Sequence, residues 1–130
     1  MAQYVRFEIY IPVVYTIRRK PGNGAEPLQL RYALDDESLR EFISATIDKY
    51  HGLTQANPLA PALYKGWWRQ RPRASIEIDY LTYLFGLVRI DEFEEAKAFF
   101  AHWKEHFERS LEQDIILLIF YPVQTIGNFL

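Results

Sequence analysis

Residues 4–17 alternate between two sets of side chains, and this alternation constrains the fold more than any other feature of the sequence. The odd positions carry aliphatic and aromatic side chains, whereas the even positions include Arg6, Glu8 and Tyr10. Successive side chains of a β-strand point to opposite faces of a sheet, so the pattern predicts a long strand with one face in the core. Pro12 cannot donate a hydrogen bond to a neighbouring strand, and we expect the strand to bend there or to lie at an edge.

Several other segments have the composition of strands. Residues 28–34 follow a loop rich in glycine and proline, and they are placed to return as a short strand. Residues 74–88 alternate in the same way as the first strand. A further short strand is expected at 64–69, inside the proline-containing loop 53–73. Residues 114–123, DIILLIFYPV, are apolar at both sets of positions, which predicts a strand in the centre of the sheet that is covered on both faces.

Two segments have the apolar periodicity of helices. The first covers Asp36–His51 and is expected to end at Gly52. The second covers Asp91–Gln113 and begins with Asp91 and Glu94, which have the spacing of a capping pair.

The order of these elements predicts the fold. A strand, a helix, a short strand, a strand, a helix and a strand follow one another, which is the split βαβ pattern of a ferredoxin-like α+β two-layer sandwich. Right-handed crossovers place both helices on one face of an antiparallel sheet. The length of 130 residues is typical of a single domain, which we expect to cover residues 1–130.

Composition excludes several classes of site. The chain has no cysteine, so disulfides, thiolate catalysis and all-cysteine zinc sites are excluded. It has no glycine-rich phosphate-binding motif, and we expect no cofactor. The longest apolar run, 115–121, is far shorter than the ~20 residues that span a membrane, and the first residues lack the pattern of a signal peptide. We therefore expect a cytoplasmic protein without a membrane partner.

The sheet face opposite the helices carries the most informative prediction. If strands 4–17 and 74–88 are neighbours, one end of this face is charged and the remainder is aromatic. Aromatic residues make up 16% of the chain, which is more than its core needs, so something must cover this face. We expect a second copy packed sheet against sheet, with Arg6 near Glu77 or Asp79; the 53–73 loop or a small ligand are the alternatives. The candidate residues here are Arg6, Glu8, Tyr10, Glu77, Asp79 and Tyr83.

The stretch KGWWRQRPRAS combines tryptophan with arginine, as surfaces that bind single-stranded nucleic acid do. The net charge of −2, together with acidic residues on the sheet face, argues against nucleic acid. Neighbouring residues of an extended chain point in opposite directions, so we expect one tryptophan to anchor the loop in the core while the cations stay solvated. The candidate residues of this stretch are Trp67, Trp68, Arg69, Arg71 and Arg73, and Lys65 is its fourth cation.

His102, Glu105 and His106 match the His-x-x-Glu-His pattern of a group of zinc proteases. A metal site needs a third protein ligand. The helical periodicity places both histidines away from the apolar stripe of their helix, so we expect exposed side chains and no metal. His102 and His106 remain weak metal candidates.

No catalytic motif is present, because no serine stands in a nucleophile-elbow setting. We interpret the chain as a non-catalytic, homo-oligomeric binding module that uses its sheet face and the Trp/Arg stretch. One alternative is a cofactor-free enzyme whose acid–base groups are Glu77, Asp79, Tyr83 and His106. The other is a single-stranded nucleic-acid binder that uses residues 65–73.

Overall fold

The computed structural model describes residues 3–19, 28–33, 36–55, 64–68, 77–111 and 116–127. Its strands are β1 (Tyr4–Arg19), β2 (Leu28–Ala33), β3 (Thr54–Gln55), β4 (Tyr64–Trp68), β5 (Glu77–Arg89) and β6 (Leu117–Val123). Its helices are α1 (Asp36–Tyr50) and α2 (Phe93–Ser110), and a 3-10 turn (Ile90–Glu92) precedes α2. The predicted strands and helices are therefore present, with ends that differ by a few residues from the prediction.

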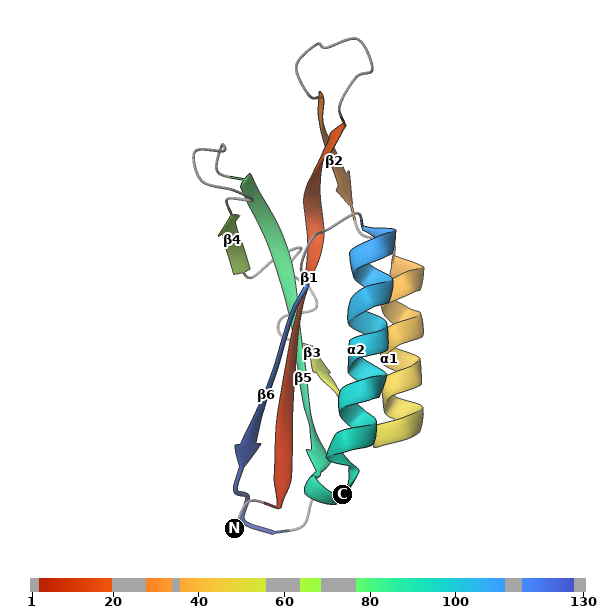
Figure 1. Ribbon diagram of the computed structural model, residues 1–130, viewed down its shortest axis with the longest axis vertical. Coiled ribbons are helices and arrows are strands. Elements are labelled where there is room, and N and C mark those ends of the chain that lie inside the picture. The colour runs from red at the N-terminus through yellow and green to blue at the C-terminus, as the bar shows by residue number, and fades with distance from the viewer. Residues whose placement is uncertain are drawn as a thin grey trace.

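All strands join one six-stranded sheet in which the pairs are antiparallel. The long strands β1 and β5 lie side by side in its centre (Figure 1). On the other edge of β1, β6 lies beside the first half and β2 lies beside the second half. β3 and β4 pair with successive parts of β5. The sheet is thus built around a central pair of strands with two short partners on each side.

Both helices lie on the same face of the sheet, side by side (Figure 1). This α+β arrangement, with an antiparallel sheet and two helices, agrees with the predicted class and is compatible with a two-layer sandwich. Neither helix in the described part of the chain is long and apolar enough to cross a membrane.

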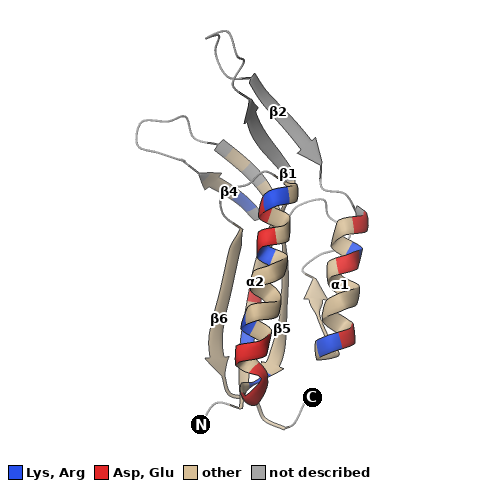
Figure 2. Cartoon of the chain, turned by 45° about the vertical axis from the view of Figure 1, so that its right-hand side comes forward, with Lys and Arg blue, Asp and Glu red and all other residues tan. Residues whose placement is uncertain are grey.

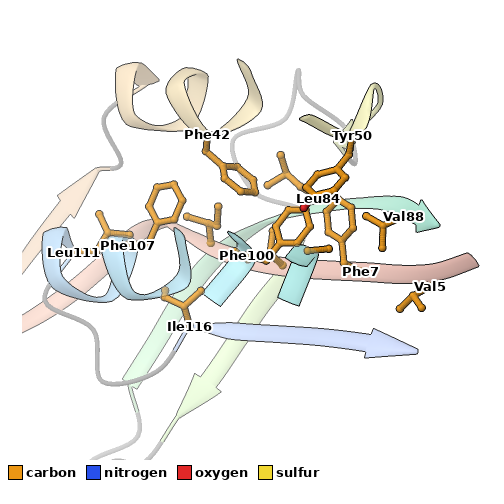
Figure 3. Close-up of a cluster of buried hydrophobic side chains, with 13 residues drawn as sticks. Val5, Phe7, Phe42, Tyr50, Leu84, Val88, Phe100, Phe107, Leu111 and Ile116 are labelled. Carbon is orange, nitrogen blue, oxygen red and sulfur yellow. The ribbon is translucent and has the colours of Figure 1, made fainter. Parts of the chain in front are cut away.

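Aromatic rings fill the space between the helices and the sheet (Figure 3). Phe7 of β1 stacks on Phe100 of α2, with ring centroids 4.0 Å apart. Phe42 of α1 lies edge-on to both Phe100 and Phe107, at 6.3 and 5.7 Å. These side chains have no exposed surface, and such pairs contribute about 0.5–1.5 kcal/mol beyond the burial of their area.

The irregularity expected at Pro12 is present as a shift of register. Pro12 lies opposite Leu81, whereas Val14 lies opposite Tyr80, so β1 has one extra residue here. Such bulges increase the local twist of a strand. The pairing of β1 with β6 ends at Tyr10, and its pairing with β2 begins at Val14. Pro12 therefore lies in the gap between the two partner strands, where its missing N–H group costs least.

The predicted capping pair of the second helix is wrong. Asp91 lies in the 3-10 turn, and the Glu92 side chain at the N-cap makes no capping hydrogen bond. The Asp91 carboxylate instead accepts hydrogen bonds from Arg89 Nε at 3.2 Å and Nη2 at 3.0 Å. A planar guanidinium that donates twice competes successfully with a backbone N–H group for this carboxylate.

The first helix ends one residue earlier than predicted. Its last residue is Tyr50, and His51 takes the left-handed conformation with φ of 70°. The His51 N–H group donates to the Ile47 carbonyl at 2.8 Å. The turn that ends the helix is therefore made by His51 and not by Gly52.

The prediction that the last strand is central and covered on both faces does not hold within one chain. β6 pairs with β1 alone among the described strands. Leu118 and Phe120 pack against the core, but Leu117 is 41% exposed and Tyr121 is 36% exposed. The sequence resembles a central strand because both faces are apolar, and the second face has no cover in the described part of the chain.

Candidate functional site on the open sheet face

The sheet face turned away from the helices carries a group of polar and aromatic side chains, here called the open-face cluster. Val5, Phe7 and Ile9 of β1 point into the core, and the residues between and after them, Arg6, Glu8 and Tyr10, therefore point to the opposite face. The antiparallel register places Tyr10 opposite Tyr83 and Arg6 opposite Tyr121. The cluster consists of Arg6, Glu8 and Tyr10 from β1, Tyr83 and Phe85 from β5, and Tyr121 from β6.

Glu8 is the hydrogen-bond acceptor at the centre of the cluster. Arg6 Nε donates to Glu8 Oε1 at 3.1 Å, and the Tyr121 hydroxyl donates to the same oxygen at 2.5 Å. The Glu8 side chain is only 12% exposed. A carboxylate in this setting needs several donors, because an unpaired buried charge is strongly unfavourable.

Arg6 links β1 to β5. Its Nη2 donates to the Tyr83 hydroxyl at 2.6 Å, and its guanidinium carbon lies 3.9 Å from the centre of the Phe85 ring. Tyr83 in turn stacks between Tyr10, at 4.9 Å, and Phe85, at 5.3 Å. The guanidinium is thus held by two hydrogen bonds and by a cation–π contact over a row of stacked rings.

The environment shifts the pKa values of Arg6, Glu8, Tyr83 and Tyr121. Burial favours the neutral form of Glu8, but hydrogen bonds from Tyr121, Tyr83 and Arg6 outweigh burial and lower the pKa of its carboxyl group. Burial raises the pKa of the Tyr83 hydroxyl, and the hydrogen bond to Glu8 raises that of Tyr121. Burial works against the charge of Arg6, yet hydrogen bonds to Tyr83 and Glu8 raise its pKa.

These shifts decide what the cluster can do chemically. A general acid or base works best when its pKa lies near the working pH. Here the pKa of the Glu8 carboxyl is lowered, and the pKa values of Tyr83, Tyr121 and Arg6 are raised, so these four groups move away from neutral pH. The charges of Arg6 and Glu8 are thus stabilised by each other and by the tyrosine hydroxyls.

The structure brings together only some of the predicted residues of this face. Arg6, Glu8 and Tyr83 are joined by hydrogen bonds, and Tyr10 stacks on Tyr83. Tyr121 was missed, because its place beside Arg6 follows from the β1–β6 register, which the sequence pattern does not specify.

The structure separates Glu77 and Asp79 from the cluster. Their backbones lie opposite Trp68 and Gly66 of β4, at the start of β5, whereas Arg6 lies opposite Leu87 near its end. The side chains of Glu77 and Asp79 lie outside the described residues. Within one chain the predicted proximity of Arg6 to these acids is wrong, because the two long strands run antiparallel, and Glu8 is the partner of Arg6 instead.

The tryptophan stretch forms part of strand β4. Trp67 is 60% exposed, and Lys65 Nζ lies 5.1 Å from its ring and 5.9 Å from the ring of Tyr80. If one of the two tryptophans is the buried anchor, it is therefore not Trp67. The side chain of Trp68 lies outside the described residues, as do Arg69, Arg71 and Arg73, so the prediction of one buried tryptophan stays a prediction.

The two histidines lie on α2. His102 is exposed, and His106 is half-buried against Trp103, with ring centroids 5.3 Å apart. The described residues include no group of three histidine, cysteine, aspartate or glutamate side chains that could hold a metal ion.

A comparison of the chain with protein-family models, with curated proteins and with solved structures finds no match. The geometry of the open sheet face is therefore the basis on which a function can be assigned.

Proposed function

We propose that the chain is a non-catalytic, homo-oligomeric binding module with a ferredoxin-like fold. The fold proposal is supported by the order β6-β1-β5-β3, in which all pairs are antiparallel and α1 and α2 connect alternate strands. This is the spatial order of a split βαβ sandwich. β2 and β4 extend the sheet beyond that arrangement.

The open sheet face is the proposed contact surface, and a second copy of the chain is its proposed partner. In a two-fold interface the same surface patch meets itself, so a net charge on the patch is repulsive. The described charges of this face, Arg6 and Glu8, neutralise each other at 3.1 Å. Leu117 and Tyr121 expose apolar surface beside them. The charge balance of the described part of this face, together with its exposed apolar surface, is the observation that carries the proposal.

The opposite layer of the molecule has a different character. Charged residues are frequent in α1 and α2, whereas β6 has none (Figure 2). Glu94 and Lys97 form an exposed ion pair at 3.1 Å. Exposed pairs of this kind contribute little to stability, and they are typical of a solvated surface. The helix layer is thus the side that faces water.

The arrangement does not favour the enzyme alternative. Tyr83 belongs to the face turned away from the helices, whereas His106 lies on α2, which covers the other face. Asp79 precedes Tyr83 by four residues, or about 13 Å along a strand. The groups expected to act together as acids and bases do not converge on one point.

Binding of single-stranded nucleic acid is a second candidate function, and one observation supports it. Trp67 is 60% exposed beside Lys65, which is the combination of ring and cation on which single-stranded bases stack. Titration with a single-stranded oligonucleotide at two salt concentrations tests this function. If the protein binds nucleic acid through this surface, binding should weaken at high salt, and Trp67→Ala should weaken it about tenfold or more. Equal binding by wild type and Trp67→Ala contradicts this function.

Self-association is tested by the mass of the protein in solution, measured by light scattering between micromolar and submillimolar concentration. We expect a dimer or larger assembly of the 15.4 kDa chain. Leu117→Glu should dissociate it, because a buried carboxylate would meet its copy across the interface. Ile47→Glu is the matched control, since Ile47 is 43% exposed and Leu117 is 41% exposed, but Ile47 lies on α1. A monomer at every concentration contradicts the proposal.

A further inference from the structure

The strand β6 has the sequence of a central strand, but among the described strands it pairs with β1 alone, as an edge strand does. Its residues, LLIFYPV, include no charged side chain. The side chains of Leu118 and Phe120 pack against the core, and those of Leu117, Ile119 and Tyr121 alternate with them on the open face. A strand that is apolar on both faces is typical of the interior of a sheet. The position of β6 in one chain does not explain this composition.

The outer edge of β6 is also less protected than the other edges of the sheet. Natural proteins protect edge strands by making them short or by adding charge or proline. β3 has two residues, and β4 has five residues that include Lys65. β2 has six residues, of which one is Arg31. β6 has seven residues, and its one protective feature is Pro122 near the end.

We propose that β6 pairs antiparallel with β6 of a second copy, so that the sheets of two chains join edge to edge. Every polar backbone group on the outer edge then gains a partner. The partner is a second copy because the strand offers no charge to attract an acidic or basic peptide, whereas two uncharged apolar strands meet without repulsion. In the joined sheet β6 becomes a central strand, which its sequence predicts.

This pairing rests on the proposed function only for the claim that the chain self-associates, and it uses a different contact. Residues directly opposite in an antiparallel pair lie on the same face, so a two-fold axis perpendicular to the sheet keeps all helices on one side. The open-face clusters of the two copies then belong to one continuous surface. Packing of sheet against sheet buries that surface and leaves the edge of β6 unpaired.

Amide hydrogen exchange of β6 at low and high protein concentration separates the two contacts. Alternate N–H groups of an edge strand point away from the sheet, and strand pairing protects them. We expect alternate amides of residues 117–121 to exchange at least tenfold more slowly in the associated protein. Association without this protection overturns the pairing of β6 and leaves the proposed function standing. A protein that is monomeric at all concentrations overturns both.

Cysteine cross-linking gives the register of the two paired β6 strands. The chain has no cysteine of its own, so each introduced cysteine can react only with its copy or with another introduced cysteine. Leu117→Cys, Ile119→Cys and Tyr121→Cys are oxidised singly and in pairwise mixtures. Residues opposite each other in paired strands have Cβ atoms about 4.5–5.5 Å apart, which is close to disulfide geometry, whereas packed sheets lie about 10 Å apart. We expect one variant or one mixture to cross-link rapidly, and Ile47→Cys not to. If every β6 variant and mixture cross-links as slowly as Ile47→Cys, the proposed pairing is wrong.

Discussion

The ring of Phe7 lies over the backbone of Gly86, its partner across β1 and β5. A Cβ atom built on Gly86 would be 2.8 Å from Phe7 Cζ, 2.9 Å from Cε1 and 3.2 Å from the Gly52 carbonyl oxygen. Phe7 cannot move aside, because Phe100 stacks on it at 4.0 Å inside the core. The absence of a side chain at residue 86 is therefore a packing requirement.

Gly86→Ala should lower the free energy of unfolding by about 1–3 kcal/mol, which is the usual cost of overpacking a core. Gly52→Ala is the control, because no atom lies within 4 Å of a Cβ atom built there. Urea denaturation of both variants checks the prediction. Equal stability of the two variants would show that the Phe7 ring relaxes without cost.

His51→Gly should raise the free energy of unfolding by about 0.5–1 kcal/mol. His51 has a φ of 70°, and a residue with a Cβ atom is strained in this region, whereas glycine is not. His51→Ala keeps the Cβ atom and should bring no gain. The comparison of the two variants in denaturant separates backbone strain from any effect of losing the imidazole.

Glu108→Ala should destabilise the protein by about 1–2 kcal/mol. Glu108 Oε2 accepts hydrogen bonds from Lys104 Nζ at 2.5 Å and from the Ile116 N–H group at 2.8 Å, which ties α2 to the residue before β6. Removing the acceptor leaves the N–H group of a buried residue without a partner. Glu108→Gln keeps an acceptor oxygen and should retain part of this stability, and Glu105→Ala, on the exposed side of α2, should cost much less. A thermal melt of the three variants tests the order.

Tyr50→Phe should not destabilise the protein at pH 7, and it should stabilise it by up to about 1 kcal/mol. The Tyr50 hydroxyl is buried without a hydrogen-bond partner among the described residues. Replacing it with phenylalanine therefore removes a buried polar group without breaking a hydrogen bond. Burial, together with Glu95 and Glu92, raises the pKa of Tyr50 to about 12 from an ordinary value of 10.0. The folded state therefore holds the phenol proton longer than the unfolded state, and this group lowers stability as pH rises from 10 to 12.

Because Tyr50→Phe has no phenol at this position, its free energy of unfolding should fall less steeply than that of wild type as the pH rises above 10. Chemical denaturation of wild type and Tyr50→Phe between pH 9 and pH 11 measures it. Tyr121→Phe is the contrasting variant, because it loses a hydrogen bond to Glu8 and should not gain stability at pH 7. A loss of stability in Tyr50→Phe would mean that the hydroxyl has a partner.

Glu8→Gln should make stability less dependent on pH in the acid range. The pKa of Glu8 lies below its ordinary value of 4.5 in the folded protein, so its contribution is fully present above pH 4.5. That contribution is lost as pH falls through the folded pKa. We expect a shallower fall of stability below pH 4.5 in Glu8→Gln than in wild type. A curve parallel to that of wild type, shifted by a constant amount, contradicts the assigned role of the carboxylate.

The periodicity of the sequence predicts the elements, but it does not predict their register. The alternation of residues 4–17 gives the long first strand, and the apolar spacing around Phe100 gives the second helix. Both are local properties of the chain. The position of Arg6 opposite Leu87, far from Glu77, depends on the antiparallel pairing of strands that are distant in sequence.

Competition between side chains explains why the predicted capping pair of α2 does not form. Asp91 and Glu94 have the spacing of a capping pair, yet Arg89 binds the Asp91 carboxylate and Lys97 binds that of Glu94. A local motif can therefore be present without its expected hydrogen bonds when stronger donors are near. The candidate site was predicted in part, since Arg6, Glu8 and Tyr83 were expected on one face and Tyr121 was not.

The two halves of β1 pair with different strands on the same edge, and this affects how the chain folds. β2 follows β1 directly, so the second half of β1 obtains its neighbour through a local hairpin. The first half pairs with β6, in which Val123 lies opposite Tyr4 and which follows all other described elements along the chain. Closing a loop of that size is entropically costly and slows folding. We expect the N-terminal half of β1 to lack its β6 neighbour until that strand has been synthesised, which leaves one edge of β1 open to aggregation in the meantime.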